Sequence, residues 1–481
     1  MMTLIQNGTI ITSSGNFPGD ILIEGEKIRA VARGGMKDLP ENVQRVDAAG
    51  RLVFPGFIDA HTHFDLHVAG TVTCDDFASG TKAAISGGTT TIIDFGTQYP
   101  GETLSDGLRN WQEKAAMGVS CDYGLHMSIT EWNDKISEEC QLMMDEGVTT
   151  FKLYLTYDTK VDDKTLYKVL TRLKEVGGIT GVHCENDGLI AALQEEYAHR
   201  GGDVSCHYRT RPPAAEAEAI GRLLHICEVV GTPVIDVHLT CEEGLKEIRA
   251  ARQRGQTVYA ETCPQYLTMT RELYDLPGPG VSGGPAARRE RADLEAPLSF
   301  NPFGARYVIS PPLREKSDND ALWRALAEGE IQTVATDHCA FTLAQKELGR
   351  NDFRKIPGGM PGVETSGEVI YSEGVARGRI SAEKMCEVLC ENPAKLYGLY
   401  PRKGVIQEGS DADLVILDPN RTKLITASRQ VSRCDYAPLE GRTLTGVVES
   451  VWLRGQQVVE DGKVIRENQG TFLKRGPFMP L

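Results

Sequence analysis

Residues 54–65 of the chain have the sequence FPGFIDAHTHFD, an apolar run that ends in two histidines separated by one residue. A short apolar run with Gly and Pro at its start is typical of a buried β-strand. Because side chains at positions i and i+2 of a strand share one face, His61 and His63 would point to the same place. A single pair of this kind indicates little by itself, so its meaning depends on the rest of the chain.

Seven further apolar runs follow, separated by stretches with helical periodicity such as residues 214–230. The eight candidate strands are GFIDAHTH (56–63), GTTTIIDFG (88–96), CDYGLHMSI (121–129), GVTTFKLYL (147–155), ITGVHCEN (179–186), PVIDVHLT (233–240), QTVYAETC (256–263) and QTVATDHC (332–339). Strands that alternate with helices predict a parallel sheet. Eight such units predict an α/β fold, a (β/α)8 TIM-like barrel. An open doubly wound sheet is the alternative, but no Gly-rich phosphate loop follows the first strand.

The two ends of the chain are rich in β-type segments. Residues 3–12, 20–31, 404–418 and 444–459 are apolar or alternating runs joined by Gly-rich turns. Because chain termini often lie close together, we expect the ends to pair into one small β-sandwich domain. The predicted organisation is a first sandwich part (1–53), the barrel (54–400), a second sandwich part (401–465) and a C-terminal tail (466–481).

The composition limits the class of protein. Of the 481 residues, 41% are hydrophobic and 25% are charged, which is typical of a globular protein. The net charge of −15 argues against nucleic acid as a partner, since phosphate binding needs a basic surface. No run of about 18 apolar residues and no secretory signal occur, so we expect a cytoplasmic protein without a membrane partner. The twelve scattered cysteines are expected to be reduced.

Polar residues that suit a metal close several of the apolar runs. His183, His238 and Asp337 end three different runs, in addition to the histidine pair at 61 and 63. Each would leave a buried polar group that needs a partner, which makes a poor pattern for core packing. A metal supplies that partner, and imidazole and carboxylate ligands suit zinc, manganese, nickel or iron. In a barrel, these residues would meet at the C-terminal mouth, where barrel enzymes have their sites.

Lys152 lies within the apolar run GVTTFKLYL. Lysine is rarely buried unpaired, so it would either pair with a core carboxylate or serve the metal site. A protonated ammonium has no lone pair and does not ligate a metal. A carbamate formed with CO2 is an anion with two oxygens that can bridge two cations.

Eight motifs of the chain resemble the dihydropyrimidinase and D-hydantoinase family. They are GFIDAHTHFD (56–65), FKLYLTYD (151–158), VHCEN (182–186), DVHLT (236–240), TCPQYL (262–267), YVISPPLR (307–314), TDHCAFTLAQK (336–346) and GSDADLVILDP (409–419). They occur in the family order, and the tail FLKRGPF (472–478) is also similar, so the resemblance covers essentially the whole chain. It implies a barrel with a small sandwich and a centre of two divalent metal ions, zinc in this family.

The resemblance also implies the ligands, position by position. The more buried metal would be bound by His61, His63 and Asp337, the outer metal by His183 and His238, and both by a hydroxide and by carboxylated Lys152. The carboxyl group on the lysine would derive from CO2.

The implied reaction is the opening of cyclic amides, 5,6-dihydropyrimidines or hydantoins, to N-carbamoyl amino acids by attack of the bridging hydroxide. Two cations lower the pKa of a bound water towards neutrality. Tyr157 would donate to the developing oxyanion, and Asp337 would pass a proton to the leaving ring nitrogen. Ser310 and Gly358 match positions that bind the substrate through the main chain, although the family usually has asparagine where Gly358 stands.

Related activities predict other residues at some of these positions. A dihydroorotase would be expected to carry arginine at the position of Asp65. Allantoinase is closer, but the HTHFD and SPPLR motifs favour the hydantoinase side. A non-catalytic scaffold relative would have lost metal ligands, whereas all six positions hold ligand types here. Dihydropyrimidines and hydantoins both remain open as the physiological substrate.

Two further segments carry predictions. The tail at 472–478 follows the last predicted strand, and we expect it to have no core of its own to join. In the resembling family such tails contact neighbouring subunits. We therefore expect a homo-oligomer, a tetramer or a dimer. The segment 277–302 is rich in Gly, Pro and charge, and would be either a lid over the pocket or a surface insertion. His67 is interpreted as a loop or pocket-wall residue, and His126 as a structural histidine.

Overall fold

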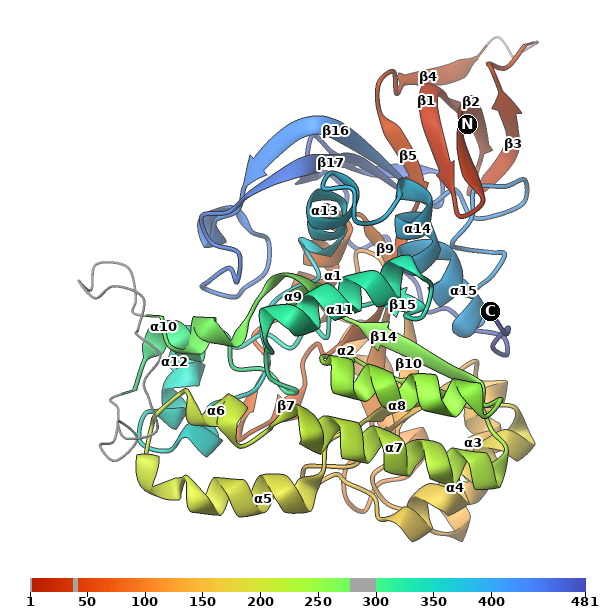
Figure 1. Cartoon of the computed structure of the whole chain (residues 1–481). Coiled ribbons are helices and arrows are strands. Elements are labelled where there is room, and N and C mark those ends of the chain that lie inside the picture. Colours follow the sequence, from red (N-terminus) through yellow and green to blue (C-terminus); the bar gives the residue numbers. More distant parts are fainter. Residues whose placement is uncertain (1, 38–41, 277–299) are drawn as a thin grey trace.

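The structure of the chain is a computed structural model that describes residues 2–37, 42–276 and 300–481. It consists of a barrel of parallel strands surrounded by helices, and of a separate sheet built from both chain ends. In Figure 1 the red N-terminal strands and the blue strands β16 and β17 lie on the same side of the barrel.

The barrel sheet contains all eight predicted strands in chain order. They are β6 (Phe57–Thr62), β9 (Thr89–Thr97), β10 (Asp122–Ser128), β11 (Thr150–Tyr154), β12 (Ile179–His183), β13 (Val234–Asp236), β14 (Val258–Thr262) and β15 (Thr333–Val334). Neighbouring strands pair in parallel, and Thr62 pairs with His338 beyond β15, which closes the ring. The predicted (β/α)8 barrel is therefore confirmed.

Helices between and after the strands cover the outside of the barrel, so the strands are buried on both faces and read as continuous apolar runs. The longer ones are α1 (Phe77–Ser86), α2 (Leu104–Ala115), α3 (Asp134–Asp145), α4 (Asp163–Val176), α5 (Asp187–Glu196), α7 (Pro213–Val230), α8 (Glu242–Gln253) and α11 (Lys316–Ala327). The shorter ones are α6 (Cys206–Arg209), α9 (Pro264–Thr268), α10 (Pro302–Ala305), α12 (Leu343–Lys346), α13 (Ser366–Ile370), α14 (Ala382–Cys386) and α15 (Asn392–Leu396).

Local sequence explains where these helices begin and end. Asp162 accepts a hydrogen bond from the backbone N–H of Thr165 and so caps the start of α4. The same helix ends at Gly177, whose φ of 80° is a conformation that favours glycine. Helix ends of this kind turn the chain back towards the next barrel strand.

The two chain ends meet in one nine-stranded sheet, as the sequence predicts. Its strands are β1 (Met2–Thr12), β2 (Gly15–Glu24), β3 (Lys27–Arg33), β4 (Val43–Asp47), β5 (Leu52–Pro55), β16 (Leu414–Leu424), β17 (Thr443–Leu453), β18 (Gln456–Glu460) and β19 (Lys463–Val464). The antiparallel pairing of β5 with β16, from Leu414 opposite Pro55 to Leu417 opposite Leu52, joins the N-terminal and C-terminal halves. A two-stranded hairpin, β7 (His67–Val68) and β8 (Thr71–Val72), is separate.

A buried ion cluster ties this sheet to the barrel. The ammonium of Lys403 lies 2.7 Å from Asp122 of β10 and 3.2 Å from Asp411, and it also contacts Asp413. All four residues are buried, so their charges need compensation from partners. Arg454 at Asp122, and Lys27 and Arg402 at Asp411, add to the compensation within the cluster.

The C-terminal tail joins the barrel core, so the expectation that it has no core to join is wrong. Leu473 is buried in the cluster that also contains Ile58 and Tyr397. The N–H of Leu473 donates to the carbonyl of Tyr123, and the guanidinium of Arg475 donates to the carbonyl of Tyr397 at 3.2 Å. The reason is that the tail continues past the last sheet strand along the edge of β10, where apolar side chains are available.

All twelve cysteines are free, and eleven of them are buried, in agreement with the predicted reduced thiols. Within the described ranges, no helix combines the length and apolar character that a membrane crossing requires.

Candidate metal centre

His61, His63 and Asp337 converge at the mouth of the barrel. The Nε2 atoms of His61 and His63 each lie 3.3 Å from Oδ1 of Asp337. The two histidines come from the end of β6, and Asp337 follows β15, the strand that closes the ring against β6. Barrel closure therefore brings together residues that are more than 270 positions apart in the chain.

His183 and His238 extend this group. Their ring centroids are 4.5 Å apart, and the ring of His238 lies 5.4 Å from that of His61. His183 is the last residue of β12, and His238 stands two residues beyond β13. The structure thus brings all four predicted histidines into one continuous cluster.

Several residues of the site have a left-handed backbone. The φ angles are 46° at His238, 51° at Asp337 and 72° at Tyr157. Such conformations are unfavourable for residues other than glycine and persist where the surrounding structure enforces them. They turn side chains that follow short strands towards the barrel axis, a feature that strand periodicity does not predict.

Lys152 lies within the same group. In the part of the chain that the structure describes, its buried Nζ forms no hydrogen bond, which does not fit the alternative of a lysine paired directly with a core carboxylate. The nearest aromatic rings, those of Phe95 and Tyr154, have centroids 5.2 Å from Nζ. Burial lowers the pKa of Lys152 to about 8, although the nearby carboxyl groups of Asp337 and Glu261 oppose the shift.

These side chains fit divalent cations. Burial lowers the pKa of His61, His183 and His238, so their imidazoles are neutral and offer lone pairs. Among the described residues, the buried Nδ1 atom of His238 has no hydrogen-bond partner, like Nζ of Lys152. Two buried nitrogens without partners are unfavourable unless a further group binds there.

A second acidic cluster of the described chain does not fit a metal. Asp122, Asp411 and Asp413 also have carboxylate oxygens close to one another. The ammonium of Lys403 already lies among them and neutralises part of their charge. This cluster is therefore an ion-pair network.

Two carboxylates that the sequence analysis missed orient the histidines. Nδ1 of His61 lies 2.7 Å from Glu261 of β14, and Nε2 of His183 lies 2.8 Å from Glu185. Burial alone would raise the pKa of Glu185, but Arg211 and His183 hold it at about 2. A signal existed for both glutamates: each is a charged residue at the end of an apolar run, the same criterion that identified Asp337.

Tyr157 stands beside the histidine cluster, with its ring centroid 5.0 Å from that of His183. Burial raises the pKa of Tyr157, although Arg211, whose guanidinium carbon is 5.4 Å from the ring centroid, opposes the shift. The tyrosine therefore keeps its proton and can donate it in a hydrogen bond. Ser310 also opposes this shift, so it lies near the Tyr157 hydroxyl.

Ser310 and Gly358 lie side by side. A Cβ added to Gly358 would lie 3.1 Å from Oγ of Ser310. Ser310 is half-buried and Gly358 is exposed, so a ligand can reach both.

The two other histidines of interest lie outside this group. His126 is engaged at both ring nitrogens, by Thr150 and by the carbonyl of Ala60 at 2.9 Å, in keeping with a structural role. His67 is exposed on the β7 hairpin.

The predicted lid at 277–302 lies almost entirely outside the described residues.

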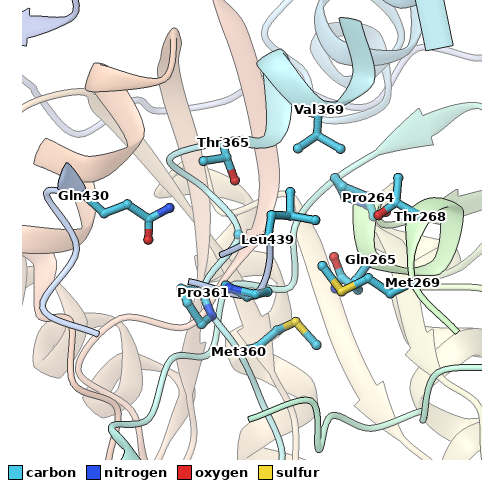
Figure 2. Close-up of a pocket in the computed structure, with 12 residues that line it drawn as sticks. Pro264, Gln265, Thr268, Met269, Met360, Pro361, Thr365, Val369, Gln430 and Leu439 are labelled. Carbon is cyan, nitrogen blue, oxygen red and sulfur yellow. The ribbon is translucent and has the colours of Figure 1, made fainter. Parts of the chain in front are cut away.

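A small hollow borders the segment that carries Gly358 (Figure 2). Figure 2 shows Leu439 in the middle with Pro361 and Met360 below it, Gln265 and Met269 on one side and Gln430 on the other. None of its lining residues is a histidine or a carboxylate, so it is not the reaction centre.

Comparison with known proteins agrees with this geometry. The model of the amidohydrolase family matches residues 52–458. The chain is 41% identical to a D-hydantoinase of Geobacillus stearothermophilus, over 100% of this chain and 98% of that protein. It is 40% identical to a D-hydantoinase of Ralstonia pickettii, over 99% of each. The chain belongs to the dihydropyrimidinase and D-hydantoinase family of amidohydrolases.

Solved structures of this family match the whole chain. The dihydropyrimidinase of Brevibacillus agri NCHU1002 has a TM-score of 0.92 at 39% identity and covers 99% of both chains. The L-hydantoinase of Arthrobacter aurescens has a TM-score of 0.86 at 30% identity, over 98% of this chain and 99% of that one. Membership of the family implies a centre of two divalent metal ions.

Proposed function

We propose that this chain hydrolyses a ring amide bond of hydantoins or 5,6-dihydropyrimidines and releases an N-carbamoyl amino acid. The observation that carries the proposal is the buried, unpartnered Nζ of Lys152 among four imidazoles and a carboxylate. Such a donor set suits a pair of zinc ions bridged by an anion at the lysine position. The amidohydrolase match and the hydantoinase relatives support the same reaction.

The ligand assignment follows the positions of the side chains. His61, His63 and Asp337 would hold the more buried ion, and His183 and His238 the outer ion. Lys152 would hold both through a carbamate formed with CO2, because carboxylation replaces an orphaned ammonium with an anion. Two divalent cations at this place would acidify a water molecule and polarise the ring carbonyl.

The residues of the chain then have distinct tasks. Tyr157 donates its phenolic hydrogen to the ring carbonyl oxygen as negative charge develops there. Asp337 accepts the proton that the attacking water gives up and delivers it to the leaving ring nitrogen. The main chain at Ser310 and Gly358 holds the amide groups of the ring, so the absence of an asparagine side chain at Gly358 is tolerated.

A direct assay tests this proposal. Protein reconstituted with Zn²⁺ and bicarbonate is expected to bind two ions per chain and to open dihydrouracil or 5-substituted hydantoins. Allantoin is assayed in parallel, because hydrolysis of allantoin alone would establish the alternative activity. The His238→Asn variant, which loses a metal ligand, serves as the inactive control. Fully metallated protein that opens none of these rings would overturn the proposal.

We also propose a homo-oligomer, a tetramer or a dimer, on the basis of the family resemblance. The contacts of Leu473 and Arg475 hold part of the tail against the barrel of its own chain. Light scattering at micromolar concentration is expected to give a multiple of 52.6 kDa, and a monomeric mass would contradict the proposal. The cytoplasmic location stays a prediction.

A further inference from the structure

Lys346 is a buried cation that the proposed reaction does not use. It ends α12 and is 1% exposed. Its Nζ donates to the carbonyl oxygens of Val308 at 2.9 Å, Pro357 at 2.6 Å and Gly359 at 2.7 Å. These bonds use all three N–H groups of the ammonium.

A lysine at this depth is unfavourable unless other groups compensate it. Burial lowers the pKa of Lys346 to about 7, and no carboxylate of the described residues forms an ion pair with it. The Phe341 ring, with its centroid 5.5 Å from Nζ, adds a weak attraction. An apolar side chain would fill this space at a lower desolvation cost, so the three carbonyls are the reason for the ammonium.

The three carbonyls belong to the two segments that carry the proposed substrate contacts. Val308 precedes Ser310 by two residues, and Pro357 and Gly359 flank Gly358. The backbone N–H of Gly359 donates to the carbonyl of Val308 at 2.9 Å, which joins the segments directly. Lys346 thus binds both of the segments that this hydrogen bond joins.

Other buried donors hold the carbonyls next to Ser310. His207 Nε2 lies 2.6 Å from the carbonyl oxygen of Ile309. The hydroxyl of Tyr266 donates to the carbonyl oxygen of Pro311 at 2.7 Å. In the part of the chain that the structure describes, the carbonyl of Ser310 itself accepts no hydrogen bond. The carbonyls on either side of Ser310 are therefore held in place, while the carbonyl oxygen of Ser310 stays free to accept a hydrogen bond from a ligand.

We propose that Lys346 is a positioning residue that holds the main chain at Ser310 and Gly358 in the arrangement that binds the substrate ring. This inference rests on the proposed function, because it concerns the same site. Lys346 contacts neither the substrate nor the metal ligands. It acts through the carbonyls that it binds on either side of the two contact positions.

The test replaces Lys346 with methionine, which keeps most of the length of the side chain and removes every donor. Lys346→Met is expected to keep two metal ions per chain and to raise KM on the order of tenfold, with a smaller change in kcat. Lys346→Gln, which keeps two N–H groups, is expected to lie between the parent and the methionine variant. Lys423→Met, which removes a lysine of the chain-end sheet that binds Glu368, is the control and should leave KM unchanged.

A second measurement is independent of activity. Amide hydrogen exchange, read by mass spectrometry on the metal-loaded protein, should accelerate at 307–314 and 356–360 in Lys346→Met and stay unchanged elsewhere. If the methionine variant does not fold, the same two measurements on Lys346→Gln decide the matter. A folded variant with parental KM and parental exchange in both segments would overturn the inference. A parent protein that hydrolyses none of the substrates would overturn the proposed function instead.

Discussion

Nδ1 of His61 lies 2.7 Å from Oε1 of Glu261, and both side chains are buried. In its ionised form, the carboxyl group of Glu261 accepts the Nδ1 proton, so Nε2, the atom that faces Asp337, carries the lone pair. This contact therefore favours the form of His61 that binds a metal through Nε2.

The first prediction concerns this carboxylate. Glu261→Gln should weaken metal binding about 10- to 100-fold, because a neutral amide holds the imidazole less firmly in the required form. Competition with a chelator, followed by metal analysis, measures the change. The control is Glu368→Gln, a buried glutamate that binds Lys423 and the N–H of Val448 away from the cluster. Equal metal affinity in the two variants would show that Glu261 does not orient His61.

The second prediction concerns Lys152. Lys152→Ala should lose metal and activity, because it removes the position at which the bridging carbamate would form. Small carboxylates such as acetate or propionate should restore part of the activity by entering the space that the side chain leaves. Metal content and hydrolysis are measured with and without the added acid. A fully metallated and fully active alanine variant would refute the carbamate.

The third prediction concerns Tyr157. Tyr157→Phe should lower kcat by about 10²- to 10³-fold, since it removes one donor to the developing oxyanion. The metals should stay bound, because the hydroxyl is not a ligand. Tyr154→Phe is the matched control: its ring also lies beside His183, with centroids 6.0 Å apart, but it has no proposed donor role. Similar kcat values for both phenylalanine variants would contradict the assignment.

The fourth prediction concerns stability. Lys403→Met should lower the free energy of unfolding by about 3–5 kcal/mol, because it removes the buried cation that pairs with Asp413 and also binds Asp122 and Asp411. Asp122 keeps Arg454 as a partner, and Asp411 keeps Lys27 and Arg402. Urea denaturation gives the value. Lys316→Met removes an exposed partner of Asp320 and should have little effect. If the two variants unfold at the same urea concentration, the cluster does not stabilise the contact between sheet and barrel.

Much of the fold follows from local patterns along the chain. Apolar runs such as 88–96 are continuous because barrel strands are covered on both faces, so their number and order predict the barrel. His61, His183, His238 and Asp337 stand out for a related reason: a polar side chain that ends a buried run needs a partner. The pairing of the chain ends could be predicted from composition, and β5 and β16 confirm it.

The sequence by itself determined which residue types stand at the ends of the barrel strands, because strand periodicity and burial are local properties. Only the tertiary structure decided which of these residues meet. The contact of His61 with Glu261 spans 200 positions, and it exists because closure of the ring places β6 near β14. The same holds for Lys346, whose donors reach carbonyls in two separate segments, and for Leu473, which finds an apolar site beside β10. Such pairings depend on the path of the whole chain, since hydrogen bonds and packing act between neighbours in space and leave no periodic signal in the sequence.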